Sequence, residues 1–501
     1  MRALLVTSAG VTCAMALTLP LATSATAAPA PDLHSASSRP PSTSPASPGA
    51  GPPAVRAGAA EPAGSTQSLP LAPLAASSDR VAGAPAAQGL PQRDARPFSL
   101  VGVVWDDPEA ELHGTVQVRT RTTGTTRWSE WQDIETHDAE HAADLGSAER
   151  EGRTVRGATA PLWVGDSDGV EVRVRPRSPE ASDHHEHAEP SDHHGSAQPQ
   201  DRAAAPVPLP EGLRLELVDP GEDPAPEAAR SAPTGRAAVT PAVFADTPPT
   251  AAVLPEALTA EAAAASAVNA ELAELGATAI PALTQKETLE SVNAAPGAKP
   301  YIGPRPKIIT RKGWGADEKL RERNFAYTKT VKAAFVHHSA TGNNYTCKQA
   351  PSVLRSIYRY HVKSSGWRDF GYNFAVDKCG NIYEGRAGGV SKAVLGAHTL
   401  GFNTNTMGIA VLGSYGSTNP PAAAVTAVSK LTAWKLGLFG ANPKGKVTLV
   451  SGGSNKYKAG VKVSMNVISG HRDGFATECP GARLYKKLGT ARTSSAKLQG
   501  R

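Results

Sequence analysis

Tracts rich in proline, alanine and serine limit where this chain can fold. Most of its 42 prolines lie before residue 300, and residues 28–95 and 220–297 consist largely of small residues and proline. Such segments bury too little apolar surface to offset the entropy lost on folding, so both are predicted to be disordered linkers, with a transient helix near 255–275. Folded domains are therefore expected at 96–219 and 298–490, followed by a loose tail at 491–501.

Residues 1–27 have the pattern of a signal peptide. Arg2 precedes an apolar run that ends at Leu21, and Ala25 and Ala27 supply small residues at the −3 and −1 positions of a cleavage site. The run is too short to span a membrane, so we predict export and no stable membrane insertion. An odd number of cysteines remains outside this segment, which gives one thiol a role other than pairing within the chain. These cysteines are Cys347, Cys379 and Cys479.

Charge is divided unevenly along the chain. Residues 301–501 contain 31 Lys and Arg against 8 Asp and Glu, a net charge of +23. Since the whole chain carries +6, the first 300 residues carry −17. A basic C-terminal part favours an anionic partner such as nucleic acid, a membrane surface or an acidic cell wall, and charge alone does not choose among them.

Residues 96–219 show the pattern of a β-rich domain. Short alternating or β-branched runs are separated by turn residues, which is typical of a β-sandwich. The histidine-rich stretch at 184–194 lacks apolar flanks, so a solvated loop is favoured over a metal site. The predicted strands are Phe98–Trp105, Gly114–Arg121, Gly169–Arg175 and Leu213–Val218.

Residues 298–490 alternate between strand and helix patterns. Apolar runs predict strands at 332–338, 372–376, 381–384 and 408–412, and apolar residues at helical spacing predict helices at 352–362 and 422–438. Interleaved elements of this kind predict an α/β or α+β domain, in which helices flank a central mixed β-sheet.

Candidate zinc donors occur at three places in this domain. The pair His337-His338 ends a predicted strand, His471 lies in Gly-His-Arg-Asp, and Cys479 lies in Glu-Cys-Pro-Gly. Zinc binds imidazole nitrogen and thiolate sulfur tetrahedrally, and a catalytic site keeps one position for water. Each residue also has a plain structural interpretation, since a lone cysteine is commonly a buried thiol. Spacing alone leaves both interpretations open.

Five ordered motifs between Ile308 and Tyr485 carry a family resemblance. They resemble the peptidoglycan recognition protein family and the phage amidases of the same fold, the N-acetylmuramoyl-L-alanine amidase type 2 family. A β-rich N-terminal domain on a linker is similar to secreted actinobacterial members. The motifs are Phe335-Val-His-His-Ser-Ala-Thr341, Gly366-Trp-Arg-Asp-Phe-Gly-Tyr-Asn-Phe374, Gly396-Ala-His398, Gly470-His-Arg-Asp473 and Thr477-Glu-Cys-Pro-Gly481.

By position, the resemblance implies that His337, His471 and Cys479 are the ligands of a Zn²⁺ ion. It favours His337 over His338 because phage relatives have another residue at the second place. Neighbours on a strand also point to opposite faces, so His338 is expected to support the site or the core. With Cys479 assigned to zinc, Cys347 and Cys379 are expected to form a disulfide, which would stabilise the fold by about 3–4 kcal/mol.

The resemblance implies three further site residues. Tyr372 falls on the family's catalytic tyrosine, and His398 falls on a histidine that lines the substrate groove. Thr477 matches a site that is lysine in phage enzymes and commonly threonine in recognition proteins. A hydroxyl such as that of Tyr372 can stabilise the developing oxyanion by roughly 3–4 kcal/mol. His398 is one candidate to carry a proton to the leaving nitrogen.

The implied activity is that of a secreted, wall-associated zinc amidase that cuts between the MurNAc lactyl group and the L-alanine of peptidoglycan. Zinc lowers the pKa of its bound water from 15.7 to about 7, which supplies a nucleophile at neutral pH. The implied partners are the glycan strand and stem peptide, with anionic wall polymers as a further candidate and no nucleic acid.

Two alternatives stay open. A non-catalytic peptidoglycan-binding recognition protein would share the groove but typically lose the metal cysteine, which this chain keeps as Cys479. A zinc-stabilised nucleic-acid binder would explain the basic domain, but export and the lack of aromatic-basic stacking motifs argue against it.

Overall fold

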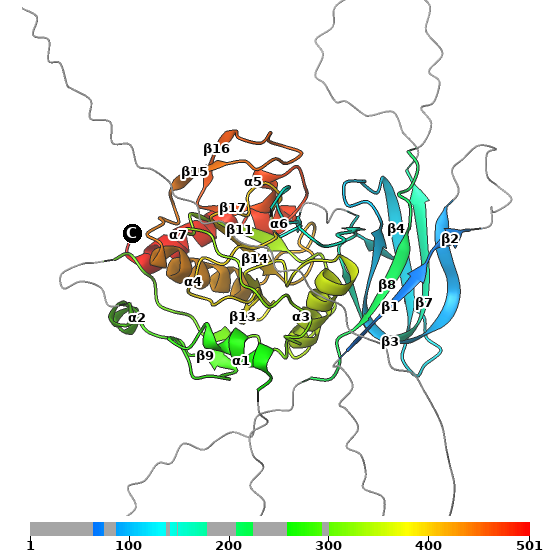
Figure 1. Ribbon diagram of the computed structural model, residues 1–501, viewed down its shortest axis with the longest axis horizontal. Coiled ribbons are helices and arrows are strands. Elements are labelled where there is room, and N and C mark those ends of the chain that lie inside the picture. Colours follow the sequence, from blue (N-terminus) through cyan, green and yellow to red (C-terminus); the bar gives the residue numbers. More distant parts are fainter. Residues whose placement is uncertain are drawn as a thin grey trace, which may run out of the picture. The chain divides into compact units, whose positions relative to one another are not determined.

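The computed structural model describes residues 64–74, 87–136, 141–147, 149–177, 207–223, 258–292 and 300–501. The predicted signal peptide and the histidine-rich stretch at 184–194 lie outside these residues. In the described part, two large sheets and one two-stranded sheet make up the β-structure (Figure 1). No helix within these ranges is both long and apolar enough to cross a membrane.

The N-terminal sheet is antiparallel and surrounds one apolar core. Alternate residues of β4 (Gly114–Thr122) are buried, among them Val116 and Val118, as expected for a strand with one face on a core. The long strand β3 (Gln88–Trp105) shifts register against β7 (Leu162–Pro176), which bends the sheet over that core. The prediction of a separate β-rich domain is confirmed. The order is β1 (Ser65–Pro70), β8 (Arg214–Asp219), β3, β7, β4, β5 (Gln132–Ile134), with β2 (Ala72–Pro73) and β6 (Gly157–Ala158) paired to β3.

The C-terminal sheet has seven strands and is mixed, as predicted. Its centre is parallel, because β11 (Ala333–His338) runs parallel to both β14 (Thr406–Val411) and β17 (Ile468–Gly470). The two central strands are buried along their whole length, which explains their continuous apolar sequence. The order is β17, β11, β14, β12 (Phe374–Val376), β13 (Ile382–Glu384), β10 (Ile308–Ile309) and β9 (Ala279–Ile280), and β15 (Lys446–Val450) pairs with β16 (Lys462–Asn466) in the small sheet.

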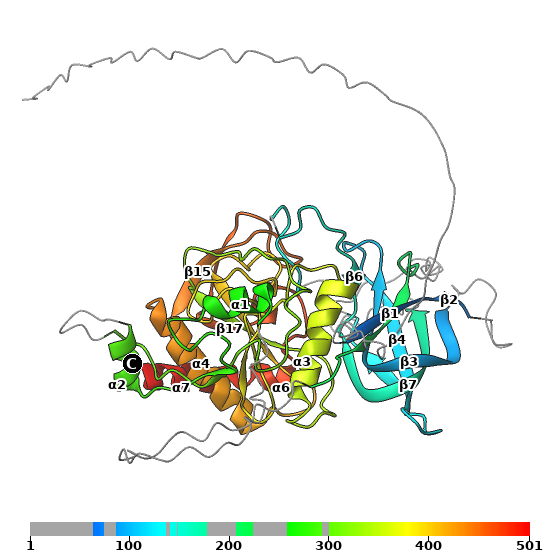
Figure 2. The same ribbon diagram turned by 60° about the horizontal axis from the view of Figure 1, so that its bottom comes forward.

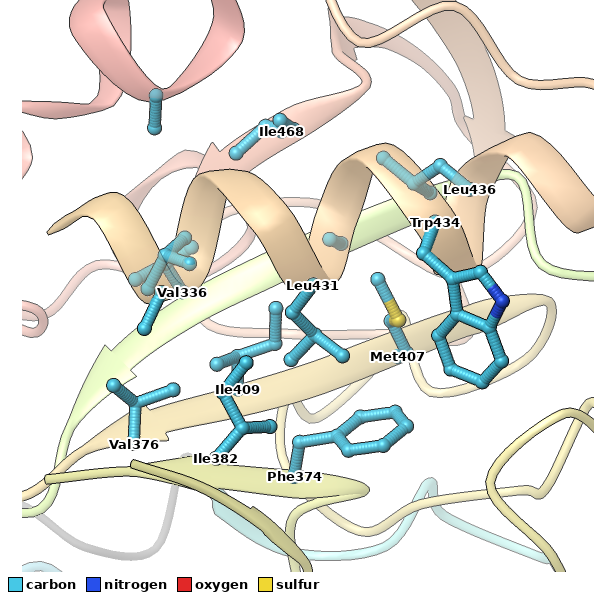
Figure 3. Close-up of a cluster of buried hydrophobic side chains, with 14 of the residues drawn as sticks. Val336, Phe374, Val376, Ile382, Met407, Ile409, Leu431, Trp434, Leu436 and Ile468 are labelled. Atoms are coloured by element: carbon cyan, nitrogen blue, oxygen red, sulfur yellow. The ribbon is translucent and has the colours of Figure 1, made fainter. Parts of the chain in front are cut away.

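Helices cover both faces of this sheet. The helix α4 (Ala422–Leu438) lies across one face, where Leu431 and Trp434 pack over strand residues such as Ile409 (Figure 3). On the other face, α3 (Ala350–Arg359) packs against the sheet through an apolar cluster that includes Ala375 and Ala410. It continues as a π-helical turn over Tyr360–Ser364. The short helices α5 (His471–Gly474) and α6 (Ala482–Tyr485) follow β17.

Three segments predicted as linker or tail belong to the fold instead. The strand β1 pairs with β8. The strand β9, which lies in the chain between α1 (Ala260–Ala267) and α2 (Gln285–Ser291), pairs with β10. The tail prediction was wrong as well, because α7 (Leu488–Gln499) packs along α4 (Figure 2). Composition indicates only how much apolar surface a segment can bury. These segments are ordered instead by hydrogen bonds to the edge strands and polar groups of neighbouring elements.

The two sheets meet through a packed contact. Leu100, Val104 and Trp163 of the N-terminal sheet share one apolar cluster with Tyr358 and Tyr360 of the C-terminal domain. The buried hydroxyl of Tyr360 donates a hydrogen bond to the carbonyl oxygen of Thr159 over 3.0 Å. The two domains therefore share an apolar contact in which this buried hydroxyl is paired.

Candidate metal centre

The ends of two parallel strands position the first two candidate ligands. His337 and His338 close β11, and His471 follows directly after the neighbouring strand β17. Because parallel strands end at the same edge of a sheet, the imidazoles of His337 and His471 meet there, with ring centroids 4.6 Å apart.

The Gly-His-Arg-Asp motif fixes where His471 lies. The carboxylate of Asp473 accepts a hydrogen bond from the backbone N–H of Gly470 over 2.9 Å, which caps the start of α5. The hydroxyl of Tyr485 donates to the same carboxylate over 2.6 Å. These contacts explain why the aspartate stands two residues after the histidine.

The Glu-Cys-Pro-Gly turn brings Cys479 back to the same edge. The backbone N–H of Cys479 donates to Oγ1 of Thr477 over 3.1 Å, and its carbonyl accepts from the N–H of Arg472 over 3.0 Å. Gly481 has a φ of +84°, and a Cβ there would lie 2.3 Å from the backbone of Tyr415, so only glycine fits this turn. The Sγ atom of Cys479 lies 3.8 Å from Nδ1 of His337.

A fourth donor comes from the N-terminal domain. His141 follows β5, and the candidate ligand atoms of His141, His337, His471 and Cys479 all lie within 4.8 Å of one another. The ligand atoms of a tetrahedral zinc ion lie about 3.4–3.6 Å apart, given Zn–N near 2.05 Å and Zn–S near 2.3 Å. The cluster is wider than this, and its fit to zinc rests on the donors, because three imidazoles and one thiol are the types that bind zinc tetrahedrally. Sequence reasoning missed His141, because it lies outside every family motif and in a polar stretch with no periodic context.

The other predicted site residues surround this cluster. The ring of Tyr372 lies 5.2 Å from that of His337, and the ring of His398 lies 5.5 Å from it. Thr477 reaches the site through its hydrogen bond to Cys479. The structure therefore brings together all six predicted residues, and their roles stay predictions.

Glycines make room for His398. A Cβ on Gly408 would lie 2.4 Å from the imidazole Cγ, and a Cβ on Gly396 would lie 2.6 Å from Cδ2. The buried side-chain oxygen of Asn403 accepts from the backbone N–H groups of His398 and Thr399 over 2.7 and 3.0 Å. The loop before β14 is thereby held against the site.

His338 points away from the cluster, as predicted from strand alternation. Its Nδ1 accepts a hydrogen bond from the backbone N–H of Tyr415 over 3.3 Å. Its Nε2 lies 3.3 Å from a carboxylate oxygen of Glu135, which belongs to the N-terminal domain. The side chain thus supports both the loop after β14 and the contact between domains.

Burial controls the protonation of the histidines. Desolvation, followed by the nearby charges of His471 and His141, keeps the pKa of His337 well below its ordinary value. Burial, then His141 and Arg386, lowers the pKa of His398 to about 3. Both rings are therefore neutral at neutral pH, which is the form in which imidazole binds a metal.

The predicted disulfide between Cys347 and Cys379 is present, with the two cysteines 32 residues apart in sequence. Among the described residues, Cys479 is the cysteine outside a disulfide, and its side chain is buried.

Comparison with known proteins covers both domains. Residues 327–482 match the family described as N-acetylmuramoyl-L-alanine amidase, and residues 53–206 match the family described as Rv3811 N-terminal galactose-binding domain-like. An N-acetylmuramoyl-L-alanine amidase of Homo sapiens is 31% identical over 189 residues, which cover 37% of this chain and 28% of that protein. Among solved structures, peptidoglycan recognition protein LE in complex with tracheal cytotoxin is 29% identical and covers 36% of this chain and 92% of that chain, with a TM-score of 0.29.

Peptidoglycan-recognition protein SC2 of Drosophila simulans matches the chain over most of its own length. The two are 31% identical over 185 residues, which cover 36% of this chain and 85% of the fly protein. The amidase family match over residues 327–482 contains His337, His471 and Cys479 of the candidate metal centre. On this identity and coverage, the chain belongs to the peptidoglycan recognition protein and N-acetylmuramoyl-L-alanine amidase type 2 family.

Proposed function

We propose that this chain is an exported zinc-dependent N-acetylmuramoyl-L-alanine amidase. It hydrolyses the amide between the MurNAc lactyl group and the L-alanine of peptidoglycan stem peptides. The observation that carries the proposal is the meeting of His337, His471 and Cys479 at one sheet edge, beside Tyr372. The cysteine favours the enzyme over a non-catalytic recognition protein, because it completes a three-ligand set for a catalytic metal.

The cluster suits zinc by the chemistry of its donors. His337, His471 and Cys479 would hold the ion, and two neutral imidazoles with one thiolate leave it a net charge near +1. Zinc, when bound, supplies Lewis acidity and a nucleophile at neutral pH. Thr477 acts as a positioning residue, since its hydroxyl accepts from the backbone N–H of Cys479 and orients the thiolate.

Tyr372 and His398 contribute the remaining chemistry. The hydroxyl of Tyr372 donates a hydrogen bond to the carbonyl oxygen of the substrate as negative charge develops there. The buried ring keeps its position through contacts with His337 and Phe370, so the donor is preorganised. The ring of His398, 5.5 Å from that of His337, is the candidate for bringing a proton to the leaving nitrogen.

Peptidoglycan is the proposed partner, outside the cell. The related protein LE was solved with tracheal cytotoxin, which its description calls monomeric diaminopimelic acid-type peptidoglycan. The +23 charge of residues 301–501 suits the anionic polymers of a cell wall. The disulfide between Cys347 and Cys379 agrees with an oxidising compartment.

Zinc content and cleavage together test the proposal. The full chain should bind one zinc ion, and Cys479→Ser should lose most of it, because a neutral hydroxyl replaces a thiolate ligand. The matched control is the double variant Cys347→Ser/Cys379→Ser, which removes two other sulfur atoms away from the cluster and should keep its zinc. Purified peptidoglycan should gain new amino termini when incubated with wild-type protein or with His141→Ala, which removes the fourth donor. Peptidoglycan binding without new amino termini from either chain would favour the recognition protein instead.

A further inference from the structure

A side chain from outside the amidase domain completes the metal cluster. A catalytic zinc site has three protein ligands and keeps the fourth position for water or substrate, whereas a structural zinc site is closed by four. Here the ring of His141 lies 4.5 Å from that of His471 and 5.3 Å from that of His337, measured between centroids. His141 thus stands where the open position would be.

The cluster is closed to a polymer in this arrangement. The exposed fractions are 4% for His141, 3% for Cys479, and 0% for His337 and His471. Tyr372 and His398 are equally buried, at 3% and 0%. A pocket of about 380 Å³ lies beside the cluster, but strand ends of the N-terminal domain, including Asp133–Thr136, form part of its wall. The docked N-terminal domain therefore restricts the access of peptidoglycan to the reacting groups.

The segment that carries His141 is hydrogen-bonded to the loop before β14. The side-chain amide nitrogen of Asn403 donates to Oδ1 of Asp144 over 2.7 Å and to the carbonyl oxygen of Ala142 over 3.1 Å. The backbone N–H of Gly401 donates to the same carboxylate over 2.7 Å. The side-chain oxygen of Asn403 meanwhile holds His398 and its neighbour, so one amide connects the segment to the site.

A buried ion pair anchors the other end of the segment. Glu149 pairs with Arg386 of the amidase domain, and the side chains are only 6% and 5% exposed. Arg368 adds hydrogen bonds to the carbonyl oxygens of Glu149 and Glu151, each over 2.9 Å. The guanidinium of Arg153 donates a hydrogen bond to the carbonyl oxygen of Trp367 over 3.1 Å. These contacts all follow His141 in the chain and are polar, unlike the apolar contact between the two sheets.

We infer that His141 is a fourth zinc ligand, and that residues 141–147 and 149–156 form an internal plug which keeps the amidase latent until it is displaced. The latency part of this inference rests on the proposed function, whereas the assignment of His141 as a zinc ligand does not depend on it. The competing interpretation is a permanently closed structural zinc site. The two differ in the result of removing His141: a latent enzyme gains activity, whereas a structural site only loses stability.

The test compares the full-length wild-type chain with His141→Ala and with the matched control His113→Ala, an exposed histidine of the same domain. Loss of one ligand should speed removal of zinc by a chelator by about 10-fold or more. If the plug is displaced in about 1% of wild-type molecules, His141→Ala should hydrolyse peptidoglycan about 100-fold faster than wild type. Added imidazole should refill the vacated position, and therefore slow both zinc loss and hydrolysis in His141→Ala alone.

A second variant opens the plug without changing the donors. Glu149→Gln leaves Arg386 buried without its anion, which disfavours the docked segment. We expect faster hydrolysis than wild type, with one zinc still bound per chain. Misfolding would lower activity, so a gain of activity in either variant cannot be explained by it.

The outcomes separate the two proposals. Equal rates of zinc loss in wild type and His141→Ala overturn the ligand assignment, whatever the hydrolysis shows. Equal rates of hydrolysis in wild type and both variants overturn latency and leave the amidase in place. If no chain hydrolyses peptidoglycan while zinc loss depends on His141, the ligand stands and the amidase proposal falls.

Discussion

Replacing Tyr372 by phenylalanine separates catalysis from metal binding. The substitution removes one hydroxyl and keeps a ring that is 3% exposed and lies 5.2–6.0 Å from the rings of His337, His141, Phe370 and His361. Because these contacts remain, zinc content and peptidoglycan binding should stay near wild type. A preorganised donor to an oxyanion contributes about 2.7–4 kcal/mol, so the turnover rate should fall about 10²- to 10³-fold.

The assay is steady-state hydrolysis of a soluble muropeptide, measured in the wild-type and the His141→Ala backgrounds. The fall should be in kcat with little change in KM, the signature of an interaction made in the transition state. Tyr383→Phe is the matched control, because its buried hydroxyl donates to Asp377 over 2.9 Å away from the cluster. That variant should lose about 1 kcal/mol of stability and keep its turnover. Full activity in Tyr372→Phe would refute the oxyanion role.

Three further perturbations test the electrostatics and stability of the chain. The fraction of protein that sediments with purified cell walls should decrease between low and moderate ionic strength, because exposed charges are screened beyond about 8–10 Å at physiological salt. Binding that does not depend on salt would mean that the +23 charge does not hold the chain to the wall. Removing the disulfide with Cys347→Ala/Cys379→Ala should lower the free energy of unfolding by about 3–4 kcal/mol while zinc content stays at one per chain, and an unchanged unfolding midpoint would refute the loop-entropy estimate. Burial, then His141 and Arg386, holds the pKa of His361 well below its ordinary value, so the unfolded chain takes up a proton below about pH 6.5 that the folded chain refuses. The free energy of unfolding should therefore decrease as the pH is lowered from 7 to 5. In His361→Asn, whose side-chain oxygen can still accept from the N–H of Gly371, denaturant unfolding should show a pH slope smaller by up to about 1.4 kcal/mol per pH unit. An unchanged slope would contradict the shift in pKa.

The sequence predicted the elements whose apolar pattern is strong by itself. The strand that ends in His337-His338 is buried at every position, and α4 carries Leu431 and Trp434 on its sheet-facing side. These elements could be predicted because neighbouring residues determine them. The three-ligand set was different, because spacing alone left it open and only the family resemblance implied it. Short-range contacts such as the cap between Gly470 and Asp473 then hold His471 in place.

Elements that depend on distant partners could not be predicted in this way. The helix α7 buries Ser495 and Gln499, which bond to Thr432 and to the carbonyl of Ala433, so its sequence lacks a clear apolar stripe. The strand β1 exists because the edge of β8 accepts it. His141 enters the metal cluster 196 residues before His337 in the chain, and only the docking of two domains places it there.

Mass spectrometry of the products tests the central claim most directly. Purified peptidoglycan is incubated with the full-length wild-type chain and with His141→Ala, and the soluble fragments are sequenced by fragmentation in the spectrometer. The account predicts free stem peptides that begin with an unblocked L-alanine, and glycan strands whose MurNAc residues carry a free lactyl carboxylate. Stem peptides that remain attached to MurNAc in both digests, or a cut within the peptide or the glycan, would contradict it.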